Sequence, residues 1–133
     1  MELIQWSGVY AVDIPEIDRQ HQELVKIINR LFQFMSEQKG KEILQPTLDE
    51  LSDYIIYHFS TEEALMKEKS YPLMAEHKAE HALFIEKVIK FRKEFDTLKT
   101  NMSIEIFYFL KDWLYHHITE VDKNMAKYIN QLK

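Results

Sequence analysis

The residues with the clearest potential chemistry are histidines and acids that fall at apolar positions of helical patterns. They are His21, His58, Glu62, His77, His81 and His117. A buried ionisable group is costly unless it is paired or bound. For any single histidine, a hydrogen-bonded place in the core is the better interpretation. Five histidines in core register would need five separate hydrogen-bonding solutions, whereas one shared metal site satisfies all of them.

The spacing of these residues sharpens the metal hypothesis. His58 and Glu62 are four residues apart and so point the same way from one helix. His77 and His81 have the same spacing and can share one ion, although residues 78–80 (KAE) exclude the zinc-protease pattern H-E-x-x-H. A further acid, Asp122, follows His117, the last histidine of the set.

His117 and Asp122 are five residues apart, which on a regular helix is about 500° of rotation and well off one face. If both bind metal, the helix must change its winding between them. The intervening Ile118, Thr119 and Val121 are β-branched and form helices weakly. We therefore predict a bulge, a tighter turn or a helix end between residues 117 and 122.

Imidazole and carboxylate donors without sulfur favour iron, zinc, copper or manganese. Five histidines and two acids are too many donors for one ion. A carboxylate has two oxygens and can span two metals, so Glu62 and Asp122 are predicted to bridge a pair of ions. The five histidines then divide into three and two. If both metals share a third bridge, one is six-coordinate and the other five-coordinate, with one position open for a small ligand.

The composition excludes several other classes of protein. A net charge of −5 without a basic cluster argues against nucleic-acid binding. The absence of cysteine excludes disulfides, thiolate zinc sites and iron–sulfur clusters. No apolar run approaches the roughly 20 residues of a membrane span, and the first residues, MELIQWSGVY, do not resemble a signal peptide. We expect a cytoplasmic location and no membrane insertion.

Only two glycines and three prolines occur, which favours helices over sheets. We expect one all-α domain over residues 1–133, an antiparallel up-down-up-down four-helix bundle with an extended N-terminal arm. The arm is expected to cover residues 1–17, and Asp18 to cap the first helix. Pro46 is expected in the first turn of the second helix, and Leu73 at the start of the third. Residues 96–101 are expected to form the turn that leads into the fourth helix.

Four segments together resemble the hemerythrins, and the match extends over nearly the whole chain, including Trp6. The segments are residues 17–24 (IDRQHQEL), 58–63 (HFSTEE), 71–81 with both histidines, and 113–122. The resemblance implies two iron ions, Fe2+ or Fe3+, joined by an oxo or hydroxo bridge and by Glu62 and Asp122. It also implies that His77, His81 and His117 hold a saturated iron, and that His21 and His58 hold an open iron that binds dioxygen.

These observations favour reversible dioxygen binding by a carrier or store, and not an enzyme; they specify no protein partner. The alternatives are an oxygen or redox sensing module, a di-iron peroxidase, iron oxidase or nitric-oxide-handling enzyme, and a structural zinc bundle. The sensor is disfavoured because the sequence ends at Lys133 without an output domain. Oxygen activation is disfavoured because ferritin-like di-iron enzymes use E-x-x-H pairs, and no glutamate precedes a histidine by three residues here.

Several other residues have weaker patterns. His116 is expected to be partly exposed and not a ligand, and Glu63 to be a solvated charge. Trp6 and Tyr10 are expected to fold over one end of the bundle. Aromatic and leucine side chains are candidates for the walls of an oxygen cavity, although core packing explains them equally well. These wall candidates are Trp6, Tyr10, Leu24, Phe59, Trp113 and Leu114.

Overall fold

The structure is a computed structural model that describes residues 3–39, 41–98 and 104–132, without the side chains of residues 41, 94–98 and 104–107. Every regular element in these ranges is helical. The elements are η1 (Gly8–Tyr10), α1 (Pro15–Ser36), α2 (Lys41–Glu68), α3 (Met74–Leu98), α4 (Ile104–His116), η2 (His117–Asp122) and α5 (Lys123–Gln131). The apolar patterns of the third and fourth helices include Phe95 and Ile106, whose side chains lie outside the described part.

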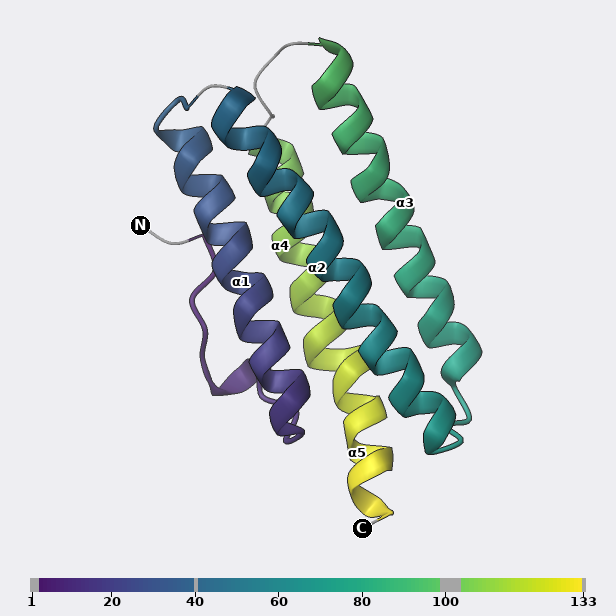
Figure 1. The fold of residues 1–133 in the computed structure, drawn as a ribbon. Coiled ribbons are helices and arrows are strands. Elements are labelled where there is room, and N and C mark those ends of the chain that lie inside the picture. The colour runs from purple at the N-terminus through teal and green to yellow at the C-terminus, as the bar shows by residue number, and fades with distance from the viewer. Residues whose placement is uncertain (1–2, 40, 99–103, 133) are drawn as a thin grey trace.

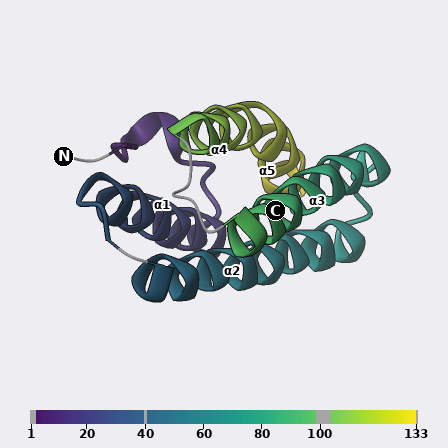
Figure 2. The same cartoon turned by 90° about the horizontal axis from the view of Figure 1, so that it is seen from above.

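The helices form four rods, because α4, η2 and α5 continue one another. The rods alternate in direction along the long axis (Figure 1), and the view from above shows them around a common centre (Figure 2). This arrangement confirms the predicted antiparallel four-helix bundle. Residues far apart in the sequence can therefore meet in its interior.

The first helix begins earlier than predicted. Pro15 stands at its start and Ile14 is the capping residue. Proline suits this position because the first helical N–H groups have no partner within the helix. Asp18 does not cap α1, since its Oδ1 atom accepts a hydrogen bond of 2.8 Å from the backbone N–H of Val12. Asp18 therefore ties the arm to the helix.

The second helix contains Pro46 in its interior, contrary to the prediction that Pro46 lies in the first turn. Proline removes one backbone hydrogen bond from a helix. The side chains of Leu44 and Leu48 on either side of Pro46 are 1% and 2% exposed, so burial of this segment offsets the missing bond. The third helix begins at Met74, so Leu73, expected as its first residue, lies just before it and is 51% exposed.

The predicted turn at residues 96–101 was wrong in its first half. Helix α3 continues to Leu98, and residues 99–103 lie outside the described part of the chain.

The fourth rod changes its winding where the sequence predicted. Residues His117–Asp122 form a π-helix, in which each backbone hydrogen bond spans five residues instead of four. This spacing brings His117 and Asp122 onto the same side of the rod. Of the three alternatives predicted between residues 117 and 122, the bulge is the one that the structure shows.

The N-terminal arm belongs to the same core as the helices. Ile4, Tyr10 and Val12 are buried in the main apolar cluster. The arm contains the short helix η1, so it is not extended throughout. The ring of Tyr10 stacks on Trp6 and meets the edge of Tyr115 in α4, so these rings pack against the side of the bundle between α1 and α4.

Candidate metal centre

All seven predicted side chains converge inside the bundle, and each is 2% exposed or less. They fall into two overlapping groups, within which one donor atom per residue lies within 4.8 Å of the others. One group contains Glu62, His77, His81, His117 and Asp122, and the other contains His21, His58, Glu62 and Asp122. The structure thus separates three histidines from two and shares both carboxylates. That these residues bind metal stays a prediction.

Each of the four rods contributes to the cluster. His21 comes from α1, and His58 and Glu62 lie one turn apart on α2. Two more histidines lie one turn apart on α3. The π-helix η2 begins with His117 and ends with Asp122. No single rod carries a complete group, so the geometry of the cluster depends on the packing of the whole bundle.

The two oxygens of Glu62 face different groups. Its Oε1 atom lies 3.1 Å from His81 Nε2 and at 3.6 and 3.7 Å from the Nε2 atoms of His77 and His117. Its Oε2 atom lies 3.4 Å from His58 Nε2 and 3.6 Å from His21 Nε2. One carboxylate therefore presents one oxygen to three histidines and the other oxygen to two.

Asp122 repeats this division. Its Oδ1 atom lies 3.0 Å from the Nε2 atoms of both His77 and His117. Its Oδ2 atom lies 3.0 Å from His21 Nε2. Both acids are oriented as a bridge between two cations would require.

The donor atoms of the cluster lack the hydrogen bonds that buried polar atoms normally make. Within the described residues, no hydrogen-bond partner is found for Nε2 of His21, His58 and His77, or for either carboxylate oxygen of Glu62 and Asp122. The Nε2 atoms of His81 and His117 face each other at 3.1 Å. Unpartnered lone pairs in a closed interior are strongly unfavourable, and bound cations would satisfy them together. The donor set fits a metal centre.

The electrostatics of the cluster also favour positive charge. Burial alone would lower the pKa of His21, but Asp122 and Glu62 beside it raise that pKa to about 9. The same two carboxylates raise the pKa of His77 and of His117 against the effect of burial. Burial opposes ionisation of both acids, yet the neighbouring histidines hold the pKa of each carboxyl below its usual range. Without metal, protons supply the positive charge.

A second layer of polar groups contacts the outer nitrogens of three histidines. His58 Nδ1 lies 2.7 Å from the amide Oε1 of Gln20, and His81 Nδ1 lies 3.0 Å from Glu63 Oε2. His117 Nδ1 lies 3.6 Å from Glu80 Oε1, longer than a hydrogen bond, and this contact lowers the pKa of Glu80.

The expectation that Glu63 is a solvated charge was wrong, because it partners His81 and its side chain is 30% exposed. Gln20 and Glu80 were not singled out from the sequence. Gln20 could have been found, because it falls three residues from Ile17 and four from Leu24 on the apolar stripe of the first helix.

Aromatic rings pack directly on two of the histidines. Phe59 stacks on His81 with the ring centres 3.8 Å apart, and Trp113 stacks on His117 at 4.4 Å. Leu24 and Leu114, also expected near the site, are buried in the main core. These side chains keep the surroundings of the cluster apolar.

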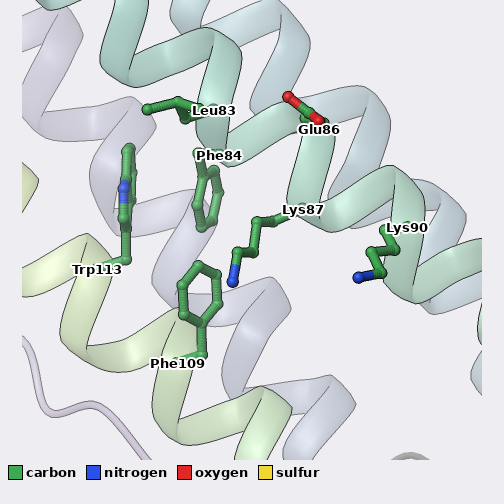
Figure 3. Close-up of a pocket in the computed structure, with 7 residues that line it drawn as sticks. All are labelled: Leu83, Phe84, Glu86, Lys87, Lys90, Phe109 and Trp113. Carbon is green, nitrogen blue, oxygen red and sulfur yellow. The ribbon is translucent and has the colours of Figure 1, made fainter.

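Trp113 also separates the cluster from the outside. It stacks on Phe84 at 3.9 Å and, with that ring, lines a groove of about 370 Å3 between α3 and α4 (Figure 3). The remaining residues that line the groove are Leu83, Glu86, Lys87, Lys90 and Phe109. His116, as expected, points away from the cluster; its side chain is 57% exposed and pairs with Glu120 at 2.8 Å.

Known proteins match this chain over most of its length. A family model described as the hemerythrin HHE cation binding domain matches residues 12–129. A bacteriohemerythrin from Stenotrophomonas maltophilia is 32% identical, over 95% of this chain and 81% of the relative. A bacteriohemerythrin from Pseudomonas aeruginosa is 33% identical, over 100% of this chain and 84% of the relative. A myohemerythrin from Theromyzon tessulatum is 31% identical, over 91% and 89%.

The fold has the same relatives. A crystal structure of wild-type hemerythrin superposes with a TM-score of 0.87 at 29% identity, over 94% of this chain and 96% of that one. Among the helices that the structure describes, none has the length and apolar character needed to cross a membrane. The length of the family match, the level of identity to several relatives and the shared bundle lead to one conclusion: the chain belongs to the hemerythrin family.

Proposed function

We propose that this protein is an oxygen carrier or store that binds dioxygen reversibly at a di-iron centre. In this proposal Glu62 and Asp122 bridge the irons. His77, His81 and His117 are terminal ligands of one iron, and His21 and His58 of the other. Membership in the hemerythrin family supports a di-iron oxygen-binding protein that is not an enzyme.

The observation that carries the assignment of ligands is the division of oxygens in the two acids. Glu62 and Asp122 each direct one oxygen toward the three-histidine group and the other toward the two-histidine group. A single ion would not use both oxygens in this way. The two-histidine group offers one donor fewer than the other, so a small ligand has room there, as in metal sites that keep an open position.

The side chains around the centre suit reversible binding. Two bound irons would supply the two electrons that dioxygen binding requires. Phe59 and Trp113 cover histidine faces, and the donors themselves are almost completely buried, so bulk water is kept from the centre. Excluding water and protons limits the side reactions that would oxidise the centre irreversibly.

We also propose that residues 1–133 act as one domain in the cytoplasm. The arm supports the first part, since Ile4, Tyr10 and Val12 share the main core with the helices. The absence of cysteine is in keeping with a reducing compartment.

The test combines metal analysis with oxygen titration. Purified protein should contain two irons per chain. The ferrous protein, prepared without oxygen, should gain ligand-to-iron charge-transfer bands on exposure to dioxygen and lose them when the gas is removed, over repeated cycles. His116→Ala is a matched control, because this histidine lies outside the cluster; it should keep two irons, whereas Glu62→Ala should not. A colourless zinc protein would exclude the proposal, and irreversible oxidation with peroxide turnover would indicate an enzyme instead.

A further inference from the structure

The two halves of the metal centre differ in the charge of the groups behind their histidines. In the two-histidine group, His58 contacts the neutral amide of Gln20 at 2.7 Å. In the three-histidine group, His81 contacts the carboxylate of Glu63 at 3.0 Å, and the carboxylate of Glu80 lies 3.6 Å from His117.

The contrast rests on the two contacts within hydrogen-bond distance, Gln20 with His58 and Glu63 with His81. For the Nδ1 atoms of His21, His77 and His117, no hydrogen-bond partner is found among the residues that the structure describes.

The orientation of the Gln20 amide is fixed by its other neighbour. Its Nε2 donates to the hydroxyl oxygen of Thr61 at 3.4 Å, and that hydroxyl in turn donates to the carbonyl of Tyr57 at 3.1 Å. The amide oxygen is therefore the atom that faces His58. Because His58 Nε2 faces the cluster, its Nδ1 carries the hydrogen and donates it to Gln20. Gln20 is only 2% exposed, so water does not compete for this contact.

The charge of such an acceptor changes the ligand that it touches. A histidine that donates to a carboxylate becomes more basic and gives more electron density to its metal. Hydrogen bonds to a charged partner are also roughly twice as strong as those between neutral groups. In a buried site these effects are larger than in water. A metal held by His81 would thus be the more electron-rich of the pair, and a metal held by His58 would be comparatively electron-poor.

We propose that Gln20 is a positioning residue that keeps the midpoint potential of the iron at the open position high. This iron then stays ferrous and can take up and release dioxygen. This inference rests on the proposed function. A carboxylate at the same place would add negative charge behind His58 and stabilise ferric iron relative to ferrous iron. A neutral amide holds His58 in the same orientation without adding negative charge.

The test compares three side chains at one position. Gln20→Glu is nearly isosteric and places a carboxylate against His58, and Gln20→Met removes the acceptor without adding charge. The midpoint potential of the iron-loaded protein, measured without dioxygen, should follow the order Glu below Gln below Met. Gln20→Glu should shift the ferric-to-ferrous equilibrium about tenfold, which is about 59 mV for a one-electron couple. Its autoxidation rate should rise by about the same factor.

Glu63→Gln is the matched control on the other half of the centre. It removes a negative charge behind His81, so the midpoint potential should rise, opposite to the effect of Gln20→Glu. The side chain of Glu63 is 30% exposed, so the protein should tolerate this change. The effect of charge behind a histidine can then still be measured if Gln20→Glu fails to fold. If all variants keep two irons and the potential does not move, or moves the same way in Gln20→Glu and Glu63→Gln, the inference is overturned. Failure of the proposed function would be visible separately, as wild-type protein that lacks two irons or does not release dioxygen.

Discussion

Raising the pH of the metal-free protein from 6.5 to 10 should lower its free energy of unfolding by about 3 kcal/mol through His21 alone. His21 is fully buried, with its Nε2 atom 3.0 Å from Asp122 and 3.6 Å from Glu62. These carboxylates raise its pKa from 6.5 to about 9. At about 1.4 kcal/mol per pH unit, the imidazolium is roughly 3 kcal/mol better stabilised in the folded state than in the unfolded chain.

The direction of the effect follows from the raised pKa. The unfolded chain loses its proton near pH 6.5, whereas folded His21 keeps it to about pH 9. Its contribution to stability is therefore complete below pH 6.5 and disappears as the pH rises through 9. The raised pKa values of His77 and His117 act in the same sense. A loss of about 3 kcal/mol is a large fraction of a typical stability of roughly 5–15 kcal/mol.

Urea unfolding followed by circular dichroism at pH 6.0, 7.5 and 9.5 measures this effect. With a typical slope of about 1–3 kcal/mol per molar urea, the midpoint should fall by about 1–3 M over this range. His21→Asn should flatten the pH dependence. Iron-loaded protein should show little of it, because the metal replaces the protons. A midpoint of the metal-free protein that stays constant or rises above pH 6.5 would refute the reasoning.

Three further outcomes are expected. Phe59→Ala should lower the free energy of unfolding by about 3–5 kcal/mol, because it leaves a cavity beside His81 in a fully buried part of the core. Urea unfolding of the iron-loaded protein measures this change. A change under about 1 kcal/mol would contradict the packing described. Inserting one alanine after Val121 should place Asp122 six residues after His117, about 600° of helical rotation and well off the face of the cluster. Bound iron should fall below two per chain, while circular dichroism shows the helices retained. Acid should release the metal as the histidines protonate, beginning near or below pH 6.5; metal still bound at pH 3 would be the opposite result.

The sequence predicted which side chains meet inside the bundle better than it predicted the ends of the helices. Polar residues at apolar positions can be recognised from the periodicity of the sequence around them, which depends only on nearby residues. His58 with Glu62 and His77 with His81 follow directly from the four-residue repeat. The five-residue interval from His117 to Asp122 predicted a change of winding, because a regular α-helix does not place both of its ends on one face; that the change is a π-helix came from the structure.

What the sequence could not supply depends on contacts between distant segments. The start of α2 before Pro46 is decided by the burial of Leu44 in the core, which outweighs the local preference of proline for a first turn. The acceptors behind the histidines are another example. Gln20 meets His58 across 38 residues of sequence, and Glu80 approaches His117 from another helix. Such pairings exist only after the bundle has assembled.

The π-helix links the metal to the C-terminal end of the chain. A wide turn of this kind is rare because its backbone hydrogen bonds are less favourable than those of an α-helix, and it persists where something else holds it. In the proposed centre, the groups that hold it are the ligands at its two ends, His117 and Asp122. Removing the metal releases that hold, so amide hydrogens of η2 and α5 should exchange with deuterated solvent faster than those of α1. Hydrogen exchange in α5, which extends to Gln131 and lies beyond Asp122, would therefore depend on whether the proposed centre holds metal.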